Sequence, residues 1–475
     1  MEIHYTTAEI KLFETIAKAA QQTDCEAYII GGFVRDKLLN RNTKDVDIVT
    51  NKDGIALAQK VASFYTPSPT INIFKTFGTA QIKLPTIELE FVGARKESYT
   101  YNSRKPTVST GTINEDQLRR DFTINALAIS LQPHSYGQVI DPFDGITDLQ
   151  QKIIRTPLAP EQTFSDDPLR MLRAIRFATQ LHFTIHPTTL QGIAAQAHRI
   201  AIISKERVAE ELNKILLCKK PSIGFMLLRS TGLLQLIFPE MVALEGAEYI
   251  DNQGHKDNFL HTLQVVDNIC HTTNDLWLRW AAVLHDIAKP RTKRFEASKG
   301  FTFHGHEVVG AKMVPKIFDK LKLPLNEKMR FVQKMVLLHL RPISLTKKEI
   351  TDSAIRRLLF DAGDDYDALM LLCNADITSK NAVKVKRYLE NFELVRQRCT
   401  AVEERDHIRS WQPPIDGEKI MELFDLPPSK PVGILKAAIK DAILDGYIEN
   451  TYEAAYAFVV QRAKALYPNM QVKAQ

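Results

Sequence analysis

The hydrophobic pattern of residues 28–49 predicts a strand, a turn, a helix and a second strand. Residues 28–30 form a short apolar run typical of a buried strand, and Gly31 and Gly32 interrupt it. Residues 34–39 have helical character, whereas residues 45–49 alternate polar and apolar side chains as a strand does. This part of the chain is therefore expected to have a mixed α/β structure.

The pattern changes twice further along. Two more strands are predicted at residues 82–84 and 87–92, while the polar, basic segment from residue 95 to about 114 lacks periodicity and predicts a mobile loop. From about residue 166 onward nearly every segment has helical amphipathic spacing, punctuated by prolines. The predicted fold class is α+β, with a small α/β head followed by a long all-α body.

Composition and net charge narrow the expected cellular location but do not identify a function. The 475 residues carry a net charge of +6, which suits a polyanionic partner but is common among unrelated proteins. The sequence has no apolar run of membrane length and no secretory signal pattern. The five cysteines, at positions 25, 218, 270, 373 and 399, form no CxxC pair. We therefore expect a cytoplasmic protein without membrane attachment, a disulfide framework or a cysteine-rich zinc site.

Asp45 and Asp47 are the first candidate for chemistry. Side chains two residues apart on a strand share a face, so the two carboxylates are expected side by side, where a cation keeps both ionised. Hard oxygen ligands favour Mg²⁺, and backbone N–H groups at a glycine turn before a helix favour an anion. A triphosphate held between the turn and a carboxylate-bound metal fits both features. A solvated Asp-x-Asp pair beside an ordinary glycine turn is the alternative.

Longer motifs extend this pattern. Residues 115–129 read EDQLRRDFTINALAI, and residues 141–177 read DPFDGITDLQQKIIRTPLAPEQTFSDDPLRMLRAIRF. With GGFVRD at 31–36, the DVD strand and ISKERVAEEL at 203–212, the chain resembles the class II tRNA nucleotidyltransferase and poly(A) polymerase family over roughly residues 25–240. The resemblance implies a nucleotidyltransferase head followed by helical neck, body and tail. CCA-adding members of this family build the CCA end of tRNA from CTP and ATP without a nucleic-acid template.

The resemblance also implies roles for the residues of the head. Asp45 and Asp47 would bind Mg²⁺, and Glu90 would be either a third acid of the site or one solvated acid of an alternating strand. Two Mg²⁺ ions would lower the pKa of the RNA 3′-hydroxyl and steady the departing pyrophosphate. The triphosphate-binding turn corresponds to Gly31, Gly32, Arg35 and Asp36. Pairing with a local neighbour is the alternative for this arginine.

Asp167 and Arg170 are implied to act as a protein template for the incoming base. The pairing edges of C and A each carry an amine donor beside a ring-nitrogen acceptor, which a carboxylate and a guanidinium can match. U and G present a carbonyl and an N–H at those places, and each polar group left unpaired costs about 1–3 kcal/mol. Asp167 before Pro168 is also a good helix cap, which would leave Arg170 an ordinary helix residue. The two roles of Asp167 are compatible.

The RRDFTINA segment resembles the family's ribose and nucleotide contact region. Its matching residues are Arg119, Arg120, Asp121 and Asn125. The arginines are expected to contact phosphate, and the aspartate and asparagine to contact the sugar. A helix start with exposed arginines is the alternative. Arg173 and Arg176 continue the templating helix and are expected either to hold the template residues or to contact phosphate.

A second set of residues stands in the later half of the chain. Its members are His261, His285, Asp286, His306, His339 and Asp376. Their order resembles the HD phosphohydrolase superfamily over about residues 255–380. By that resemblance His261, His285, Asp286 and Asp376 bind one metal, and His306 and His339 extend the site to a second.

Imidazole and carboxylate suit a divalent transition metal, which can activate water against a phosphoester. Lys289 is expected to contact phosphate, and a helical scaffold that cradles RNA is the alternative.

The main prediction is a CCA-adding tRNA nucleotidyltransferase that binds tRNA, CTP and ATP, but neither DNA nor a membrane. The expected domains are a nucleotidyltransferase head at 1–155, a helical neck and RNA- or nucleotide-binding region at 156–250, an HD domain at 251–380 and a helical tail at 381–475. Family members that add only CC tend to have a shortened loop at the position of residues 95–114, and this loop looks full-length. The alternatives are a poly(A) polymerase, an A-adding tRNA nucleotidyltransferase, and an HD phosphohydrolase acting on RNA 2′,3′-cyclic or 2′-phosphates.

Overall fold

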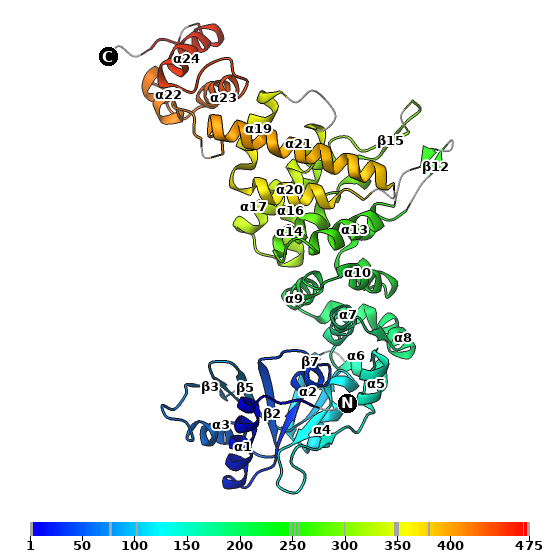
Figure 1. Ribbon diagram of the computed structural model, residues 1–475. Coiled ribbons are helices and arrows are strands. Elements are labelled where there is room, and N and C mark those ends of the chain that lie inside the picture. The colour runs from blue at the N-terminus through cyan, green and yellow to red at the C-terminus, as the bar shows by residue number, and fades with distance from the viewer. Residues whose placement is uncertain are drawn as a thin grey trace. The chain divides into compact units, whose positions relative to one another are not determined.

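The chain forms two compact units, Met1–Val242 and Ala243–Gln475, which are described separately (Figure 1). The computed structural model describes residues 3–75, 78–100, 103–246, 249–250, 253–254, 257–298, 300–345, 351–378, 381–409, 411–468 and 470–472. Residues 251 and 380, at which two of the predicted domain boundaries fall, lie outside these ranges.

A seven-stranded sheet forms the first part of the first unit. Its strands are β1 (Ala27–Ile30), β2 (Asp45–Thr50), β3 (Ile71–Phe74), β4 (Thr79–Lys83), β5 (Glu88–Gly93), β8 (Ala128–Ser130) and β9 (Val139–Ile140). They lie in the order β3-β4-β5-β2-β1-β8-β9, with β2 and β5 parallel and every other neighbouring pair antiparallel. The strands predicted near residues 28, 45, 82 and 87 are confirmed.

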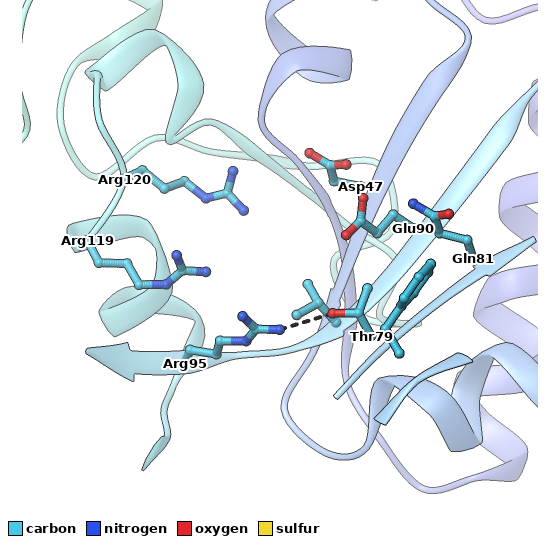
Figure 2. A pocket seen from close by; sticks show the side chains of 9 residues that line it. Asp47, Thr79, Gln81, Glu90, Arg95, Arg119 and Arg120 are labelled. Carbon is cyan, nitrogen blue, oxygen red and sulfur yellow. Dashed lines mark hydrogen bonds between the residues drawn. The ribbon is translucent and has the colours of Figure 1, made fainter. Parts of the chain in front are cut away.

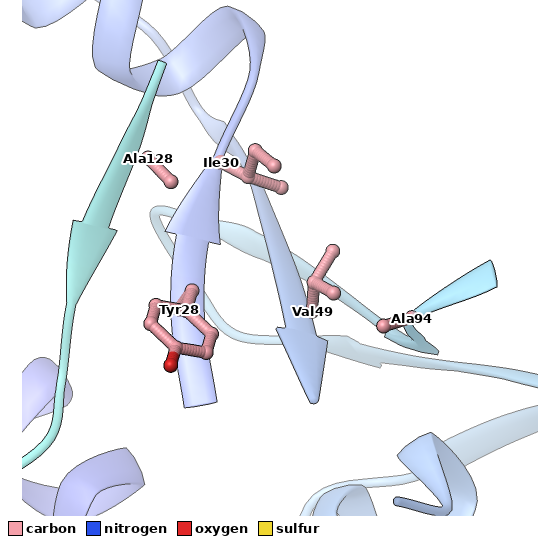
Figure 3. Close-up of a cluster of buried hydrophobic side chains, with 5 residues drawn as sticks. All are labelled: Tyr28, Ile30, Val49, Ala94 and Ala128. Carbon is pink, nitrogen blue, oxygen red and sulfur yellow. The ribbon is translucent and has the colours of Figure 1, made fainter. Parts of the chain in front are cut away.

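One face of this sheet carries a buried hydrophobic cluster and acidic side chains on the same strands. The cluster consists of Tyr28, Ile30, Val49, Ala94 and Ala128 (Figure 3). Tyr28 lies opposite Val49 and Ile30 opposite Asp47 in the β1–β2 register. Because side chains alternate along a strand, the same face continues from Val49 to Asp47 and then to Asp45. The packed core therefore fixes the face on which the carboxylates stand.

The expectation of an irregular loop at residues 95–114 is wrong. The backbone forms an antiparallel hairpin of β6 (Arg95–Thr100) and β7 (Ser103–Thr110), in which Arg95 pairs with Thr110. Tyr101 and Asn102 lie outside the described residues. Most of the sequence of both strands is polar, so this hairpin lacks the apolar alternation that reveals a strand with one buried face.

Helices complete the first unit. The head contains α1 (Thr7–Gln22), α2 (Gly32–Leu38), α3 (Gly54–Ala62), α4 (Ile113–Leu118), η2 (Thr123–Asn125) and α5 (Gly145–Gln151). The following region contains α6 (Pro160–Asp166), α7 (Leu169–Leu181), α8 (Pro187–Gln196), η3 (Ala197–Ile202), α9 (Lys205–Leu216), α10 (Pro221–Ser230), α11 (Leu233–Ile237) and α12 (Pro239–Val242), with a two-stranded parallel pair of β10 (Ile153–Ile154) and β11 (Thr184–Ile185). The predicted change from mixed to helical structure is confirmed.

The second unit is almost entirely helical. Its helices are α13 (Asn258–Cys270), α14 (Leu276–Leu284), α15 (Lys289–Thr292), α16 (His306–Leu321), α17 (Glu327–Leu338), α18 (Leu340–Leu345), α19 (Asp352–Ala362), η4 (Gly363–Asp365), α20 (Tyr366–Ala375), α21 (Ala382–Asp406), α22 (Gly417–Phe424), α23 (Lys430–Leu444) and α24 (Tyr452–Leu466). Two short hairpins join β12 (Tyr249–Ile250) to β13 (Gln253–Gly254) and β14 (Arg294–Glu296) to β15 (Gly300–Thr302). Among the described residues, no helix is both long and apolar enough to cross a membrane.

Gly145 provides a test of the head's packing. A Cβ at this position would lie 2.5 Å from the Thr123 carbonyl oxygen, which is backbone and cannot swing aside. We expect Gly145→Ala to lower the free energy of unfolding by about 1–3 kcal/mol. Gly433→Ala is the control, because a Cβ there meets no atom within 4 Å on α23, and should be neutral or slightly stabilising. Urea unfolding followed by circular dichroism compares the two, and equal midpoints would contradict the packing argument.

Candidate active site and metal centre

Asp47 and Glu90 stand side by side because β2 and β5 run parallel and pair in register. Asp47 lies opposite Glu90 across this pair, and Glu90 lies opposite Gln81 across the neighbouring strands β5 and β4. All three side chains line a cavity of about 470 Å³ (Figure 2). Asp45, two residues earlier on the same face, is exposed at the start of β2. The carboxylates predicted for metal binding therefore share one face of two neighbouring interior strands.

The opposite wall of the cavity is basic. Figure 2 shows Arg95, Arg119 and Arg120 extending toward the side on which Asp47 and Glu90 stand. Arg95 donates to the Thr79 hydroxyl at 3.1 Å. A cavity with carboxylates on one wall and guanidinium groups on the other can hold a metal ion and a polyphosphate next to each other.

Asp116 holds two of these arginines in place. Its carboxylate is fully buried and accepts hydrogen bonds from Arg119 Nε at 3.0 Å and from both Arg120 Nε and Nη2 at 3.2 Å. The arginines follow it by three and four residues, which is the spacing at which side chains meet on one side of a helix. One buried anion thus orients two cations toward the cavity.

Gly31 is required where the acidic and basic walls meet. Its φ is +82°, and a Cβ there would lie 2.8 Å from Arg120 Nη1 and 3.3 Å from Asp47 Oδ2. Gly31 does not contribute to the free N–H groups predicted for the glycine turn, because its N–H donates to the Leu127 carbonyl at 3.0 Å. The glycine admits two charged side chains to a space that any larger residue would fill.

The electrostatics around Asp47 favour a bound cation. Burial raises the pKa of this carboxyl, the Arg120 charge opposes that rise, and repulsion from Glu90 and Asp45 adds to it. A divalent ion at the acids would favour the ionised form of all three. The donor set, composed of carboxylate oxygens, fits Mg²⁺.

A second charged network lies behind this cavity. Arg35, predicted to contact phosphate, is buried and pairs with Asp36 at 2.8 Å and with Asn125 Oδ1 at 2.7 Å. Asn125 donates to Asp121 at 2.9 Å, and Arg173 Nε donates to the other oxygen of Asp121 at 2.7 Å. Arg35 thus pairs locally with Asp36 and also contacts the distant Asn125, and its contact with phosphate stays a prediction.

Asp121 is the charged centre of this network. Burial alone would raise its pKa, but the Arg173 charge and hydrogen bonds from Asn125 and Arg173 outweigh burial and lower the pKa to about 2. Asp121 therefore stays ionised and ties the segment after α4 to α7.

The two residues predicted to read the base lie at the start of α7, Asp167 two residues before the helix and Arg170 within it. Asp167 accepts the Leu169 N–H at 3.1 Å, so it does cap the start of this helix, and Arg170 Nη2 donates to the Arg119 carbonyl at 2.6 Å. Arg119 lines the cavity, so this bond joins α7 to it. Arg176 Nε instead donates to Glu211 on α9 at 2.6 Å, which makes its contact structural.

The six predicted HD residues all converge in the second unit. The helices α13, α14, α16, α17 and α20 bring them together from their ends or inner faces (Figure 1). His261 Nε2 lies 2.9 Å from Asp376 Oδ1, and His306 Nε2 lies 3.2 Å from Asp286 Oδ1. Two groups of ligand atoms within 4.8 Å of one another share Asp286. One group adds His261 and His285, and the other adds His306 and His339.

The four imidazole rings share one orientation. Nδ1 of His285, His306 and His339 lies 2.7–2.8 Å from the carbonyl oxygen three residues earlier, and Nδ1 of His261 lies 2.9 Å from the Thr378 hydroxyl. A hydrogen bond at Nδ1 leaves Nε2 as the coordinating atom, which is the usual arrangement of metal-binding histidines. Among the described residues, the buried His285 Nε2 has no hydrogen-bond partner. The cluster therefore fits a metal ion.

The pKa shifts in this cluster also favour a bound cation. Burial disfavours a charged His285, but the Asp286 and Asp376 carboxylates outweigh it and raise its pKa to about 10. Burial and the neighbouring His285 charge lower the pKa of His339 to about 4, which keeps that ring neutral. Lys289 Nζ pairs with Asp286 Oδ2 at 2.6 Å. A divalent ion can supply the positive charge that His285 otherwise carries.

Three families match successive parts of the chain. Residues 27–155 match the family described as the Poly A polymerase head domain, residues 182–244 the probable RNA and SrmB-binding site of polymerase A, and residues 258–380 the HD domain. Nucleotidyltransferase and HD domains are metal-dependent, in agreement with the two donor sets described above.

Relatives extend across these regions. A Multifunctional CCA protein from Nitrosococcus oceani is 32% identical over 78% of this chain and 88% of its own length. The chain belongs to the tRNA nucleotidyltransferase family. An A-adding tRNA nucleotidyltransferase from Deinococcus radiodurans is 31% identical over 74% of this chain and 80% of its own length. The chain spans about half of tRNA nucleotidyltransferase cca2 from Schizosaccharomyces pombe, 34% identical over 48% of this chain and 51% of that protein.

Solved structures share the fold. The crystal structure of the Bacillus stearothermophilus CCA-adding enzyme in complex with CTP matches 98% of this chain and 100% of that one, with a TM-score of 0.66 and 24% identity. The α+β fold class predicted from the sequence is confirmed.

Several residues of the sites were not predicted. Asp116, Arg95 and Gln81 shape the cavity, and Thr378 orients His261. The spacing of Asp116 before the two arginines is a usable sequence signal, since i, i+3 and i+4 residues meet on a helix. Gln81 has no such signal, because its position depends on the pairing of β4 with β5.

Asp116 is the residue whose loss should disturb the basic wall. We expect Asp116→Asn to weaken binding of a nucleoside triphosphate by about tenfold or more, because Arg119 and Arg120 lose the anion that orients them. Asp148→Asn is the matched control, as Asp148 is equally buried and pairs with Arg155 outside the cavity. Calorimetric titration measures both. Equal losses would mean that the effect is structural, and no loss would mean that Asp116 does not set the site.

Proposed function

We propose that this chain adds C, C and A to the 3′ end of tRNA from CTP and ATP. The observation that carries the proposal is a cavity with the acids Asp47 and Glu90 on one wall and arginines on the other. The arginine wall is connected to the predicted base-reading helix by the hydrogen bond from Arg170 to the Arg119 carbonyl. The absence of a CxxC pair among the five cysteines suits a reducing, cytoplasmic location, in which tRNA is available.

The residues divide the chemistry between them. Asp45, Asp47 and Glu90 would hold Mg²⁺, which supplies charge neutralisation at the attacking and leaving oxygens. Arg119 and Arg120 would hold the triphosphate opposite the acids. The RNA 3′-hydroxyl loses its proton and its oxygen bonds to the α-phosphorus. The bond between the α-phosphorus and the oxygen bridging to the β-phosphate breaks, and pyrophosphate leaves. The cavity walls orient both reactants for this in-line exchange.

Base selection is assigned to Asp167 and Arg170. Asp167 Oδ1 accepts the Leu169 N–H, while Oδ2 makes no hydrogen bond among the described residues and can accept from the amine of C or A. Arg170 uses Nη2 on the Arg119 carbonyl and keeps Nε and Nη1 to donate to the ring nitrogen. Capping and base reading are thus divided between different atoms.

Primer extension tests the proposal. Transcripts of tRNA ending before CC, after C and after CC are supplied with each nucleotide alone and with CTP plus ATP, in Mg²⁺. We expect CCA to be completed and extension to stop there.

Asp47→Asn should abolish addition. Asp167→Asn should lower incorporation of C and A about tenfold or more and weaken the rejection of U and G. The exposed Glu161→Gln on α6 is the control and should leave both unchanged.

Other outcomes separate the alternatives. Extension only from the CC end would identify an A-adding enzyme, the activity named for the Deinococcus radiodurans relative. Long A runs on any RNA would identify a poly(A) polymerase, and no extension would remove the proposal.

We also propose that the HD cluster hydrolyses phosphoesters of RNA, such as 2′,3′-cyclic or 2′-phosphates, with a divalent transition metal. His285 Nε2 lies 3.2 Å from Asp286 Oδ2 without a hydrogen bond among the described residues, and this position together with the common ring orientation favours the second function. In the reaction a water oxygen bonds to phosphorus, the ester P–O bond breaks, and the departing oxygen takes a proton. Bound metal would supply the activated water.

His285→Ala tests this second site. We expect loss of bound metal, measured by elemental analysis, and loss of phosphate release from adenosine 2′-phosphate with added Mn²⁺, Co²⁺ or Ni²⁺. Primer extension should be unchanged, because the acids of the head belong to the other unit. His304→Ala changes an exposed histidine next to the cluster and should affect none of the three. If His285→Ala impaired addition and hydrolysis equally, the two-site proposal would be wrong.

A further inference from the structure

The hairpin β14–β15 begins directly beside the HD cluster. Lys289 connects the two, because its Nζ pairs with Asp286 Oδ2 at 2.6 Å and also lies 5.7 Å from the centre of the Phe303 ring. The Phe303 carbonyl accepts from His306 Nδ1 at 2.8 Å. The residue that follows the hairpin therefore fixes a ring of the metal cluster.

Aromatic rings continue outward along one face of the hairpin. Phe295 and Phe301 are cross-strand partners, so they share a face, and their ring centres are 5.2 Å apart. Lys293 Nζ lies 4.7 Å from the centre of the Phe301 ring. Phe295 is 36% exposed, so part of its ring is open to a ligand. The hairpin extends away from the helices of its unit (Figure 1).

Basic residues surround these rings. The segment KPRTKR at residues 289–294 carries four cations, and Glu296 is the nearest acid along the hairpin. Arg291 and Arg294 are exposed and have no acidic partner in the described part of the chain. Cations beside exposed aromatic rings are the combination that binds nucleotides, by contacting phosphate and stacking on bases.

We propose that the β14–β15 hairpin is the nucleotide-recognition element of the HD site. Phe295 and Phe301 would stack against the base of a nucleotide, and Arg291 and Arg294 would contact its sugar and phosphate, which holds its phosphoester at the cluster. The ligand class is a ribonucleotide phosphate and not a simple alkyl phosphate. This inference rests on the proposed hydrolytic function of the same cluster and adds the residues that select its substrate.

A matched pair of substrates tests the proposal. Adenosine 2′-phosphate and glycerol 2-phosphate both present a monoester of a secondary alcohol, but only the first has a base. In the full chain with metal, we expect Phe295→Leu with Phe301→Leu, and separately Arg294→Ala, to lower kcat/KM for adenosine 2′-phosphate about fivefold or more, mainly through KM. Hydrolysis of glycerol 2-phosphate should not change. The control is Arg330→Ala, an exposed arginine on α17.

Binding provides a readout apart from turnover. Equilibrium dialysis of adenosine 2′-phosphate with EDTA-treated protein should show weaker binding by the hairpin variants than by the control. Equal loss on both substrates would make the hairpin merely structural, and no loss on either would also overturn the proposal. If the unaltered protein hydrolyses neither substrate, the hydrolytic function fails. Unchanged dialysis by the hairpin variants would then overturn the recognition proposal on its own.

Discussion

Repulsion between the carboxylates of Asp47 and Glu90 is the constraint around which the head is organised. Parallel pairing of β2 with β5 holds the two acids opposite each other, and burial of Asp47 strengthens their mutual repulsion. The other features of the cavity relieve or use this charge. Arg120 offsets part of it, Gly31 lets that guanidinium approach, and the acids together form a site for a divalent ion.

The second unit also brings carboxylates close together, but histidines surround them. Asp286 is buried and Asp376 is partly buried, and their combined charge raises the pKa of His285 against the effect of its burial. Backbone carbonyls fix three of the four rings from behind, so the helices that carry the histidines also determine which ring nitrogen faces the centre. Both sites therefore concentrate negative charge on rigid elements. Arginines stand opposite this charge in the head, and imidazoles surround it in the HD cluster.

Sequence reasoning found the features that depend on local spacing. The DxD strand and the histidine set were recognisable because the first follows the two-residue period of a strand and the second stands in an ordered series. It failed where pairing decides the structure. Residues 95–110 form a hairpin despite polar strands, and the contact of Arg35 with Asn125, 90 residues away in the chain, has no local sequence signal. Asp116 was missed although its spacing from Arg119 and Arg120 was visible, whereas Gln81 enters the cavity only through strand register.

The register of β2 with β5 has a consequence for preparing this protein. A slip by one residue would place Phe91 or Leu89 opposite Asp47 in place of Glu90, and would turn buried apolar side chains toward water. The same error would thus remove both the core and the acid pair. A head misfolded in this way would lack the acid pair and would contribute nothing to a single-turnover burst, so the burst would count only heads with the native register.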